Sequence, residues 1–328
     1  MRKLVVITFI LNIIAVTGLF LMYGPFSYFR DMLVLTANET MTHHYIARIF
    51  YEQETIDQVL KNNRIVVIID NTDLREIGGD ADSLEKDRPM DEYEAAILDH
   101  EEGALYKVIT IKEPNYTGYL VAIYDPSRID LAMTQNLGRS GQFITTMSRN
   151  NGAQVAINAS GFQNKSNVAT GGFPAGRIIK DGEFIWNEGG AWAGGLIGFT
   201  YDNKLLLTYQ SAEEAIEMGM RDAVEFGPFL IVNGKPLEIV GQGNMGVAPR
   251  TAIGQRKDGT VLFLVIDGRQ PGYSLGADLK DLVDIFTRYR AHNAANLDGG
   301  ASTSLVIDNK IVNRQNYDRA APNAWIVK

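Results

Sequence analysis

Short runs of apolar and β-branched residues alternate along most of this chain with turns rich in glycine, aspartate and asparagine. Such runs, bounded by turn residues, are typical of β-strands. We expect strands at residues 64–70, 105–111, 119–124, 129–134, 154–157, 193–200, 205–208, 229–232, 261–266, 294–297, 304–307 and 323–327. The apolar pairs on both sides of residues 180–183 predict a further hairpin.

Two segments of the same region have the three-to-four spacing of a helix instead. Residues 275–290 give the clearest pattern, with Leu279, Leu282, Val283 and Phe286 on one face. Residues 142–151 predict a shorter helix. Many strands and few helices, without regular β–α alternation, indicate an α+β fold with a mixed, mostly antiparallel sheet.

The N-terminal pattern is different, because residues 4–24 form an almost unbroken apolar run without a charge. A run of about 20 residues crosses a bilayer core. Arg2 and Lys3 precede it, so the positive-inside rule places the N-terminus in the cytoplasm and the rest outside the cell membrane, in a single pass. The competing interpretation is a cleaved signal peptide. The residues around Tyr23 make a poor cleavage site, which favours an uncleaved transmembrane anchor.

A helical stalk is expected after the anchor, because apolar residues between 32 and 62 recur every three or four positions. A helix packed on the main body fits the pattern equally well. His43 and His44 lie here, and adjacent side chains point in different directions on a helix, so they do not predict a shared metal. Residues 79–103 are acidic and predict a linker with one short helix. The expected domains are 1–24 (anchor), 25–103 (stalk and linker) and 104–328 (catalytic domain).

Composition limits the classes of function. The formal net charge is −8 and the sequence pI is about 5.1. No basic cluster is present, which argues against nucleic acid as a partner. The chain has no cysteine. This absence excludes disulfides, thiolate metal sites and cysteine nucleophiles.

Two predicted strands end directly in an Asp-Gly pair, and these are the strongest candidates for chemistry. Asp267 follows residues 261–266, and Asp298 follows residues 294–297. Gly299, Gly300 and a run of hydroxyl side chains come after Asp298, a pattern suited to an anionic or polyhydroxylated ligand. We expect the two strand ends to form two walls of one site. The Asp-Gly pairs at 181–182 and 258–259 lie between pairable runs and are interpreted as hairpin turns.

Several segments occur together in the order typical of one family. They are Asn158-Ala159-Ser160-Gly161-Phe162, Pro249-Arg250-Thr251-Ala252-Ile253-Gly254, Asp267-Gly268-Arg269 and Asn296-Leu297-Asp298-Gly299-Gly300-Ala301-Ser302. Over residues 105–328 the chain resembles the phosphodiester glycosidase family, which includes the mammalian enzyme that removes N-acetylglucosamine from a phosphodiester on lysosomal enzymes. One departure is that many members carry Asn-Gly-Gly-x-Phe where this chain has residues 158–162.

The resemblance implies hydrolysis of the bond between a sugar C1 and a phosphodiester oxygen. Such a transition state needs a carboxylate near C1, and arginine holds phosphate with a planar fork. Asp298 is then the carboxylate at C1, as nucleophile or base, and Asp267 the second carboxylate, although the reverse assignment fits almost as well. The implied binding residues are Arg250 and Arg269 for phosphate, and Asn158, Ser302, Thr303 and the N–H groups of Gly299 and Gly300 for sugar or phosphate oxygens. The anchor places the substrate, a carbohydrate phosphodiester, on a surface polysaccharide or wall glycopolymer.

Other interpretations of the same residues stay open. The arginines could form salt bridges that only tie strands together. The cleft could belong to a non-catalytic glycan-binding protein or to an exopolysaccharide-assembly protein that passes a glycosyl group to an acceptor. No cofactor is predicted, although the acids could bind a divalent cation. Among the aromatic residues, Trp192 is a candidate for the pocket rim, Trp186 for core packing, and His292 for a structural role.

Overall fold

A computed structural model describes residues 2–39, 45–78, 90–163, 170–188, 194–315 and 318–328. The chain divides into two compact units. The first comprises Met1–Val66 with Ile239–Val247, and the second comprises Val67–Glu238 with Ala248–Lys328. The predicted boundary between residues 103 and 104 does not coincide with this division. The reason is that residues 67–78 pair with the main body: Thr72 exchanges hydrogen bonds with the main chain of Leu207, at 3.2 and 2.9 Å.

The first unit contains the apolar helix α1 (Arg2–Tyr23), which is long and apolar enough to cross a membrane, a property it shares with signal sequences. Three further helices follow: α2 (Ser27–Glu39), α3 (Tyr45–Phe50) and α4 (Gln53–Asn62). The amphipathic pattern therefore forms three short helices, with Val34, Leu35, Ile56 and Val59 in a small core of their own. His43 and His44 lie outside the described residues.

The first unit also includes a segment from the middle of the chain. Strand β1 (Arg64–Val66) pairs with β13 (Glu238–Val240). The side chain of Asn63 accepts a hydrogen bond from the N–H of Gln242 at 2.7 Å and donates to Asp31 at 3.0 Å. A chain cut at residue 104 would therefore leave segment 239–247 without its partners, so experiments on this protein need the full chain.

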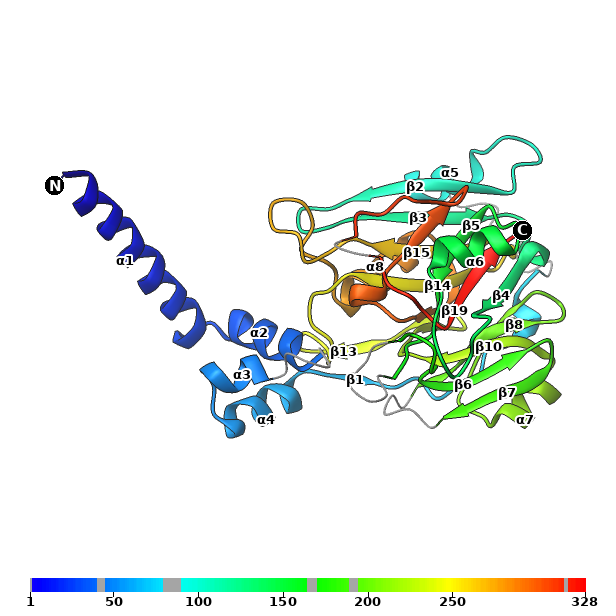
Figure 1. Ribbon diagram of the computed structural model, residues 1–328, viewed down its shortest axis with the longest axis horizontal. Helices are drawn as coiled ribbons and strands as arrows, with labels where there is room; N and C mark the ends of the chain where they lie inside the picture. Colours follow the sequence, from blue (N-terminus) through cyan, green and yellow to red (C-terminus); the bar gives the residue numbers. More distant parts are fainter. Residues whose placement is uncertain (1, 40–44, 79–89, 164–169, 189–193, 316–317) are drawn as a thin grey trace. The chain divides into compact units, whose positions relative to one another are not determined.

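The second unit is built from three antiparallel sheets, shown in cyan to red in Figure 1. The largest has the order β12-β11-β16-β14-β15-β3-β2. Its strands are β12 (Lys235–Pro236), β11 (Phe229–Val232), β16 (Ala291–Asn296), β14 (Arg250–Arg256), β15 (Val261–Ile266), β3 (Thr117–Ile123) and β2 (Tyr106–Lys112).

The other two sheets have five strands each, in the orders β7-β6-β10-β8-β9 and β18-β17-β5-β19-β4. The first contains β7 (Glu183–Glu188), β6 (Gly176–Lys180), β10 (Met220–Phe226), β8 (Gly195–Thr200) and β9 (Leu205–Thr208). The second contains β18 (Lys310–Ile311), β17 (Leu305–Ile307), β5 (Val155–Asn158), β19 (Asn323–Val327) and β4 (Ile129–Met133). One core joins all three sheets, including Phe263, Phe199 and Trp325. The α+β prediction is confirmed.

Four short helices accompany these sheets in the described part of the second unit: α5 (Glu92–Leu98), α6 (Ile144–Asn150), α7 (Ala212–Glu217) and α8 (Leu279–Arg288). Helix α6 packs on the sheet of β5 and β19 through Ile144 and Met147. Helix α8 begins four residues later than the start predicted at residue 275. Asp278 caps it and forms a reciprocal capping box with Asp281, which fixes the first turn.

Candidate active site

The two Asp-Gly strand ends lie at one edge of the seven-stranded sheet. Strand β14 is paired on one side with β15 and on the other with β16, both antiparallel. Arg250 is opposite Ile266, and Ala252 is opposite Asn296. Asp267 and Asp298 therefore leave the sheet on either side of Arg250, at the point where β14 begins. This arrangement agrees with the expectation of two walls at one site.

Asp298 is half-buried, and its main chain is fixed at both polar atoms. Its N–H donates to the carbonyl of Ala159 at 3.1 Å, and its carbonyl accepts from the amide of Asn158 at 2.6 Å. Burial raises the pKa of Asp298 to about 6, against the lowering effects of Ser302 and Arg319. A carboxyl with this pKa changes protonation in the range where many enzymes work, which is a property of catalytic acids and bases.

Arg319 is a site residue that the sequence did not reveal. Its guanidinium carbon lies 4.4 Å from the ring centroid of Phe162, within cation–π range. Its charge also acts on Asp298. Arg319 lies outside the family motifs and follows no strand-end pattern. The only available signal is the aromatic residue that ends the 158–162 segment.

Asn158 is completely buried and hydrogen-bonded beneath Asp298. Its side-chain oxygen accepts from the Thr251 hydroxyl at 2.8 Å and from the N–H of Ser304 at 3.0 Å. Its amide nitrogen donates to the Asp298 carbonyl. The amide therefore joins three chain segments under Asp298. The expected contact of Asn158 with sugar or phosphate oxygens stays a prediction.

The N–H groups of the two glycines after Asp298 have partners inside the protein. The N–H of Gly300 donates to the carbonyl of Pro249 at 2.8 Å, and that of Gly299 acts on the Asp298 carboxylate. The expected contact of these N–H groups with a ligand stays a prediction. Ser302 and Thr303 are 5% and 3% exposed. The Ser302 hydroxyl acts on the Asp298 carboxylate and lowers its pKa, whereas the Thr303 hydroxyl has no hydrogen-bond partner among the described residues. The Thr303 hydroxyl is therefore available to a ligand.

Asp267 is buried in a network on the other side of Arg250. Its carboxylate accepts from the Tyr273 hydroxyl at 3.0 Å and from the Asn313 amide at 3.3 Å. Burial raises the pKa of Asp267, opposed by the N–H of Arg314, the Tyr273 hydroxyl and the Asn313 amide. The carboxyl is thus oriented by three donors and carries a proton more readily than an ordinary aspartate.

The two predicted phosphate-binding arginines have different surroundings. Arg250 is 1% exposed, and its Nε donates to the carbonyl of Ala277 at 3.0 Å, which ties β14 to the loop before α8. Arg269 is exposed, has a left-handed backbone with φ of +57°, and makes no ion pair with any described residue. Non-glycine residues adopt this conformation at a cost, often at functional sites. Arg269 therefore fits the role of a ligand-binding cation better than Arg250.

Gly300 lies in the turn after Asp298, and its backbone conformation gives a matched test. Its φ is +61°, and a β-carbon built on it would meet the Arg269 guanidinium only at van der Waals distance. Gly152, in the turn after α6, has φ of +63° and open space around it. Each alanine variant should lose about 1–2 kcal/mol of stability from the left-handed backbone. We expect only Gly300→Ala to lower kcat/KM, by about tenfold, because only its strained backbone shifts the turn that holds Asp298. Equal activity of the two variants would contradict a role for this turn in the reaction.

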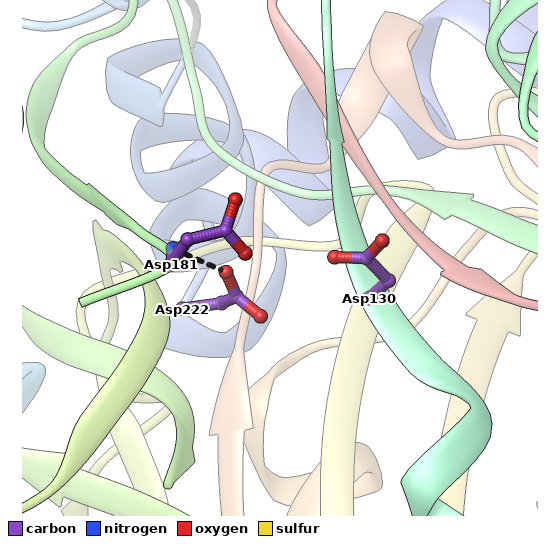
Figure 2. A group of neighbouring side chains, drawn as sticks. All are labelled: Asp130, Asp181 and Asp222. Carbon is purple, nitrogen blue, oxygen red and sulfur yellow. Dashed lines mark hydrogen bonds between the residues drawn. The ribbon is translucent and has the colours of Figure 1, made fainter. Parts of the chain in front are cut away.

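A separate group of acids lies away from these residues. Figure 2 shows Asp181 and Asp222 joined through a main-chain N–H, with Asp130 facing them. Their carboxylate oxygens lie within 4.8 Å of one another, a spacing that a metal ion could bridge. The ammonium of Lys180, however, lies 2.9, 2.5 and 3.0 Å from the oxygens of Asp130, Asp181 and Asp222. The lysine already supplies the positive charge, so the group is a charge-paired structural cluster.

The aromatic candidates also have definite places. Trp186 packs against the core and donates from its ring nitrogen to the carbonyl of Pro174 at 3.0 Å, in agreement with the prediction of core packing. His292 is 5% exposed and lies 3.0 Å from Glu76, far along the sheet from Arg250, at the start of β16. Trp192 lies outside the described residues.

Comparison with known proteins gives two kinds of finding. Over 178 residues the chain is 30% identical to the SPbeta prophage-derived uncharacterized protein YomE of Bacillus subtilis (strain 168), which is 52% of this chain and 27% of that protein. The chain thus spans about a quarter of the length of this relative. The catalytic domain of zebrafish N-acetylglucosamine-1-phosphodiester α-N-acetylglucosaminidase, auto-inhibited by its pro-peptide, has a TM-score of 0.56 at 19% identity, over 70% of this chain and 85% of that one.

A hypothetical protein from Synechocystis has a TM-score of 0.51 at 17% identity, over 68% of this chain and 61% of its own. At these identities the two structures establish the fold alone. The model of the phosphodiester glycosidase family matches residues 151–328, more than half of the chain. The matched region includes Asp267, Asp298 and the arginines between and after them. The chain therefore belongs to the phosphodiester glycosidase family.

Proposed function

We propose that this protein hydrolyses the bond between C1 of a sugar and the oxygen of a phosphodiester. The observation that supports this most is the half-buried Asp298, whose pKa is raised to about 6 at the sheet edge that it shares with Asp267. The Thr303 hydroxyl, buried without a partner among the described residues, adds a group that a polyhydroxylated ligand would satisfy. Family membership supplies the reaction class.

In this proposal Asp298 is the carboxylate at C1. The C1–O bond breaks, the bridging oxygen leaves with the phosphate, and water supplies the hydroxyl that ends on C1. The developing positive charge on the sugar ring is stabilised by a carboxylate, which acts as nucleophile or as base toward water. The leaving group is a stabilised anion, so it needs little help from an acid. Asp267, oriented by Tyr273 and Asn313, is the second carboxylate.

Cations stabilise the departing phosphate. Arg269 is exposed and without an ion pair among the described residues, so its planar fork can bind phosphate oxygens. Arg250, buried beneath the site, holds the loop before α8 in place through Ala277. Asn158 fixes the main chain of Asp298 from below. These roles divide the predicted residues into those that contact the substrate and those that position the contacts.

The pKa of Asp298 predicts the pH dependence of activity. A nucleophile or base must be ionised, so kcat/KM should rise tenfold per pH unit below about pH 6 and level off above it. Arg319 lowers the pKa of Asp298, and Arg319→Gln should therefore shift this limb to higher pH. The exposed Arg149, replaced in the same way, should leave the limb unchanged. Activity that is highest at pH 4–5 and falls above pH 6 would instead make Asp298 the acid.

The location of the reaction is part of the proposal. Helix α1 is apolar enough to anchor the chain, and Arg2 and Lys3 at its start favour an N-terminus inside the cell. The second unit would then act outside the cell membrane, on a surface polysaccharide or wall glycopolymer with a sugar-1-phosphodiester. Protease added to intact cells should digest the second unit. A protected second unit would contradict this orientation.

The function is tested with the full chain in detergent and an N-acetylglucosamine-α-phosphodiester. We expect free sugar and phosphomonoester to appear in equal amounts. An added alcohol acceptor that receives the sugar in place of water would identify a transferase of polysaccharide assembly. Binding of the substrate without turnover would identify a glycan-binding protein that uses the same cleft.

A further inference from the structure

A small cavity lies beside Asp267. Gly300 and Thr303, from the turn at residues 299–303, line another side of it. Its volume is about 50 Å³. Four chain segments line it: Pro249, residues 267–269, residues 300–303 without Ser302, and residues 313–315. Of these, the segment 313–315 carries no family motif. Its central residue, Arg314, lies at the cavity with an exposed side chain.

Two arginines line this cavity, and neither is neutralised by an ion pair with a described residue. Arg269 and Arg314 are both exposed. The guanidinium carbon of Arg314 lies 4.9 Å from the ring centroid of Tyr273, within cation–π range. The Arg314 carbonyl accepts from the Gln270 amide at 2.6 Å, and its N–H acts on the Asp267 carboxylate. The main chain and the side chain of Arg314 are therefore both held at the cavity.

A buried hydroxyl adds an independent observation. Thr303 lines the cavity, is 3% exposed, and its Oγ1 has no hydrogen-bond partner among the described residues. Its main chain is fixed, because its carbonyl accepts from Asn313 at 3.3 Å and from Gln315 at 3.1 Å. A buried hydroxyl without a partner is costly unless a ligand or water satisfies it. The hydroxyl can donate to an anionic oxygen.

Size and charge together select the ligand. A space of about 50 Å³ accommodates one small tetrahedral group. The two guanidinium groups carry more positive charge than the single carboxylate of Asp267 can neutralise. We infer that this cavity is the phosphoryl subsite of the proposed reaction, with Arg314 and Arg269 binding the phosphate oxygens and the Thr303 hydroxyl donating to one of them. The link from this cavity to a sugar substrate rests on the proposed function, whereas the binding of an anion in the cavity does not depend on it.

The charge balance has a consequence for turnover. A phosphodiester carries one negative charge, whereas the phosphomonoester product carries more at pH 7. Two arginines should therefore bind the product, and inorganic phosphate, more tightly than the substrate. Inorganic phosphate is then a competitive inhibitor and a direct probe of the subsite, without any sugar.

The test measures binding of inorganic phosphate to the full-length protein by calorimetry at pH 7.5. We expect Arg314→Gln to weaken binding at least tenfold, since the substitution removes a charge-assisted hydrogen bond to the phosphate. Arg314→Lys should recover part of the affinity, because it keeps the charge and loses the fork. Thr303→Val should weaken binding by a smaller factor. Arg149→Gln, an exposed substitution on α6, should bind as the wild type does.

The outcomes separate the subsite from the reaction. Phosphate that binds the wild type and is lost in Arg314→Gln supports the subsite even if no sugar phosphodiester is cleaved. Sugar release with equal phosphate affinity in wild type and Arg314→Gln overturns the subsite and leaves the reaction standing. Failure of the wild type to bind millimolar phosphate also overturns the subsite.

Discussion

Replacement of Asp298 by asparagine is expected to lower kcat by about 10³-fold or more while the protein stays folded, because a residue that acts directly on the reacting carbon usually has an effect of this size. The amide keeps the shape of the side chain, and the main-chain bonds to Ala159 and Asn158 do not involve the carboxylate. The raised pKa indicates that ionised Asp298 is unfavourable in its buried position. The melting temperature should accordingly stay the same or rise.

The matched control is Asp202→Asn in the exposed turn that joins β8 and β9. It changes the same functional group at a surface position and should leave kcat and the melting temperature unchanged. Initial rates at saturating substrate and thermal melts of the three proteins provide the comparison. Wild-type activity in Asp298→Asn would remove Asp298 from the chemistry. A large loss of stability would show that its role is structural.

The largest expected effect on stability belongs to Lys180. Replacement of this lysine by methionine removes the ammonium shared by Asp130, Asp181 and Asp222. Asp222 is completely buried and, among the residues that the structure describes, would keep only Arg221 as its cation, at 2.7 Å. A buried pair that loses one partner typically destabilises a protein by 3–5 kcal/mol. The ammonium is partly exposed, so we expect about 3 kcal/mol and a fall in melting temperature of about 6 °C or more.

The pH of this measurement follows from the ionisation of Lys180. Burial opposes its charge, but the hydrogen bonds to the three carboxylates raise its pKa above that of a free lysine. The stabilisation is therefore fully present below the ordinary lysine pKa of about 10.4, and is lost as the pH rises through the higher folded value. Melts at pH 7 record the whole effect. Lys257→Met is the control, since its pair with Glu76 is well exposed and should contribute less than about 1 kcal/mol. Equal melting temperatures would disprove the structural role of the cluster.

Strands with uniformly apolar sequences could be predicted well, and those with paired charges could not. Strand β15 is apolar throughout and was found from its pattern. Strand β14, at the centre of the same sheet, contains two arginines and a glutamine, and every residue of it is buried. Its polar groups are satisfied inside the protein: Gln255 accepts from the N–H of Leu205 at 2.6 Å, and Arg256 donates to the carbonyl of Tyr289 at 3.0 Å. Long-range partners of this kind leave no periodic signal in the sequence.

Strand β10 was missed for the same reason. Its interior carries Asp222, neutralised by Lys180 from β6, and Glu225, which pairs with Arg177 at 2.8 Å. Two acidic residues within seven positions predict an exposed segment unless their partners are known. The partners lie more than 40 residues away along the chain, on a neighbouring strand.

The candidate site shows the same division. Asp267 and Asp298 could be predicted because each ends an apolar strand, and the pairing of both strands with β14 accounts for their common edge. The surroundings of Asn158, Gly299 and Gly300 could not be predicted, because the sequence does not show that their polar groups have partners inside the protein. Arg314 and Arg319 each lie in a described segment without helix or strand, so no spacing pattern connects them to the two acids.

Cleavage between C1 and oxygen is tested by hydrolysis of the sugar phosphodiester in ¹⁸O-labelled water. The phosphomonoester is then analysed by mass spectrometry, because its oxygens do not exchange with water under mild conditions. If water or the Asp298 carboxylate attacks C1, the bridging oxygen stays on phosphorus and the phosphomonoester contains no label. A phosphomonoester with one ¹⁸O atom would show attack at phosphorus and would contradict the glycosidase mechanism.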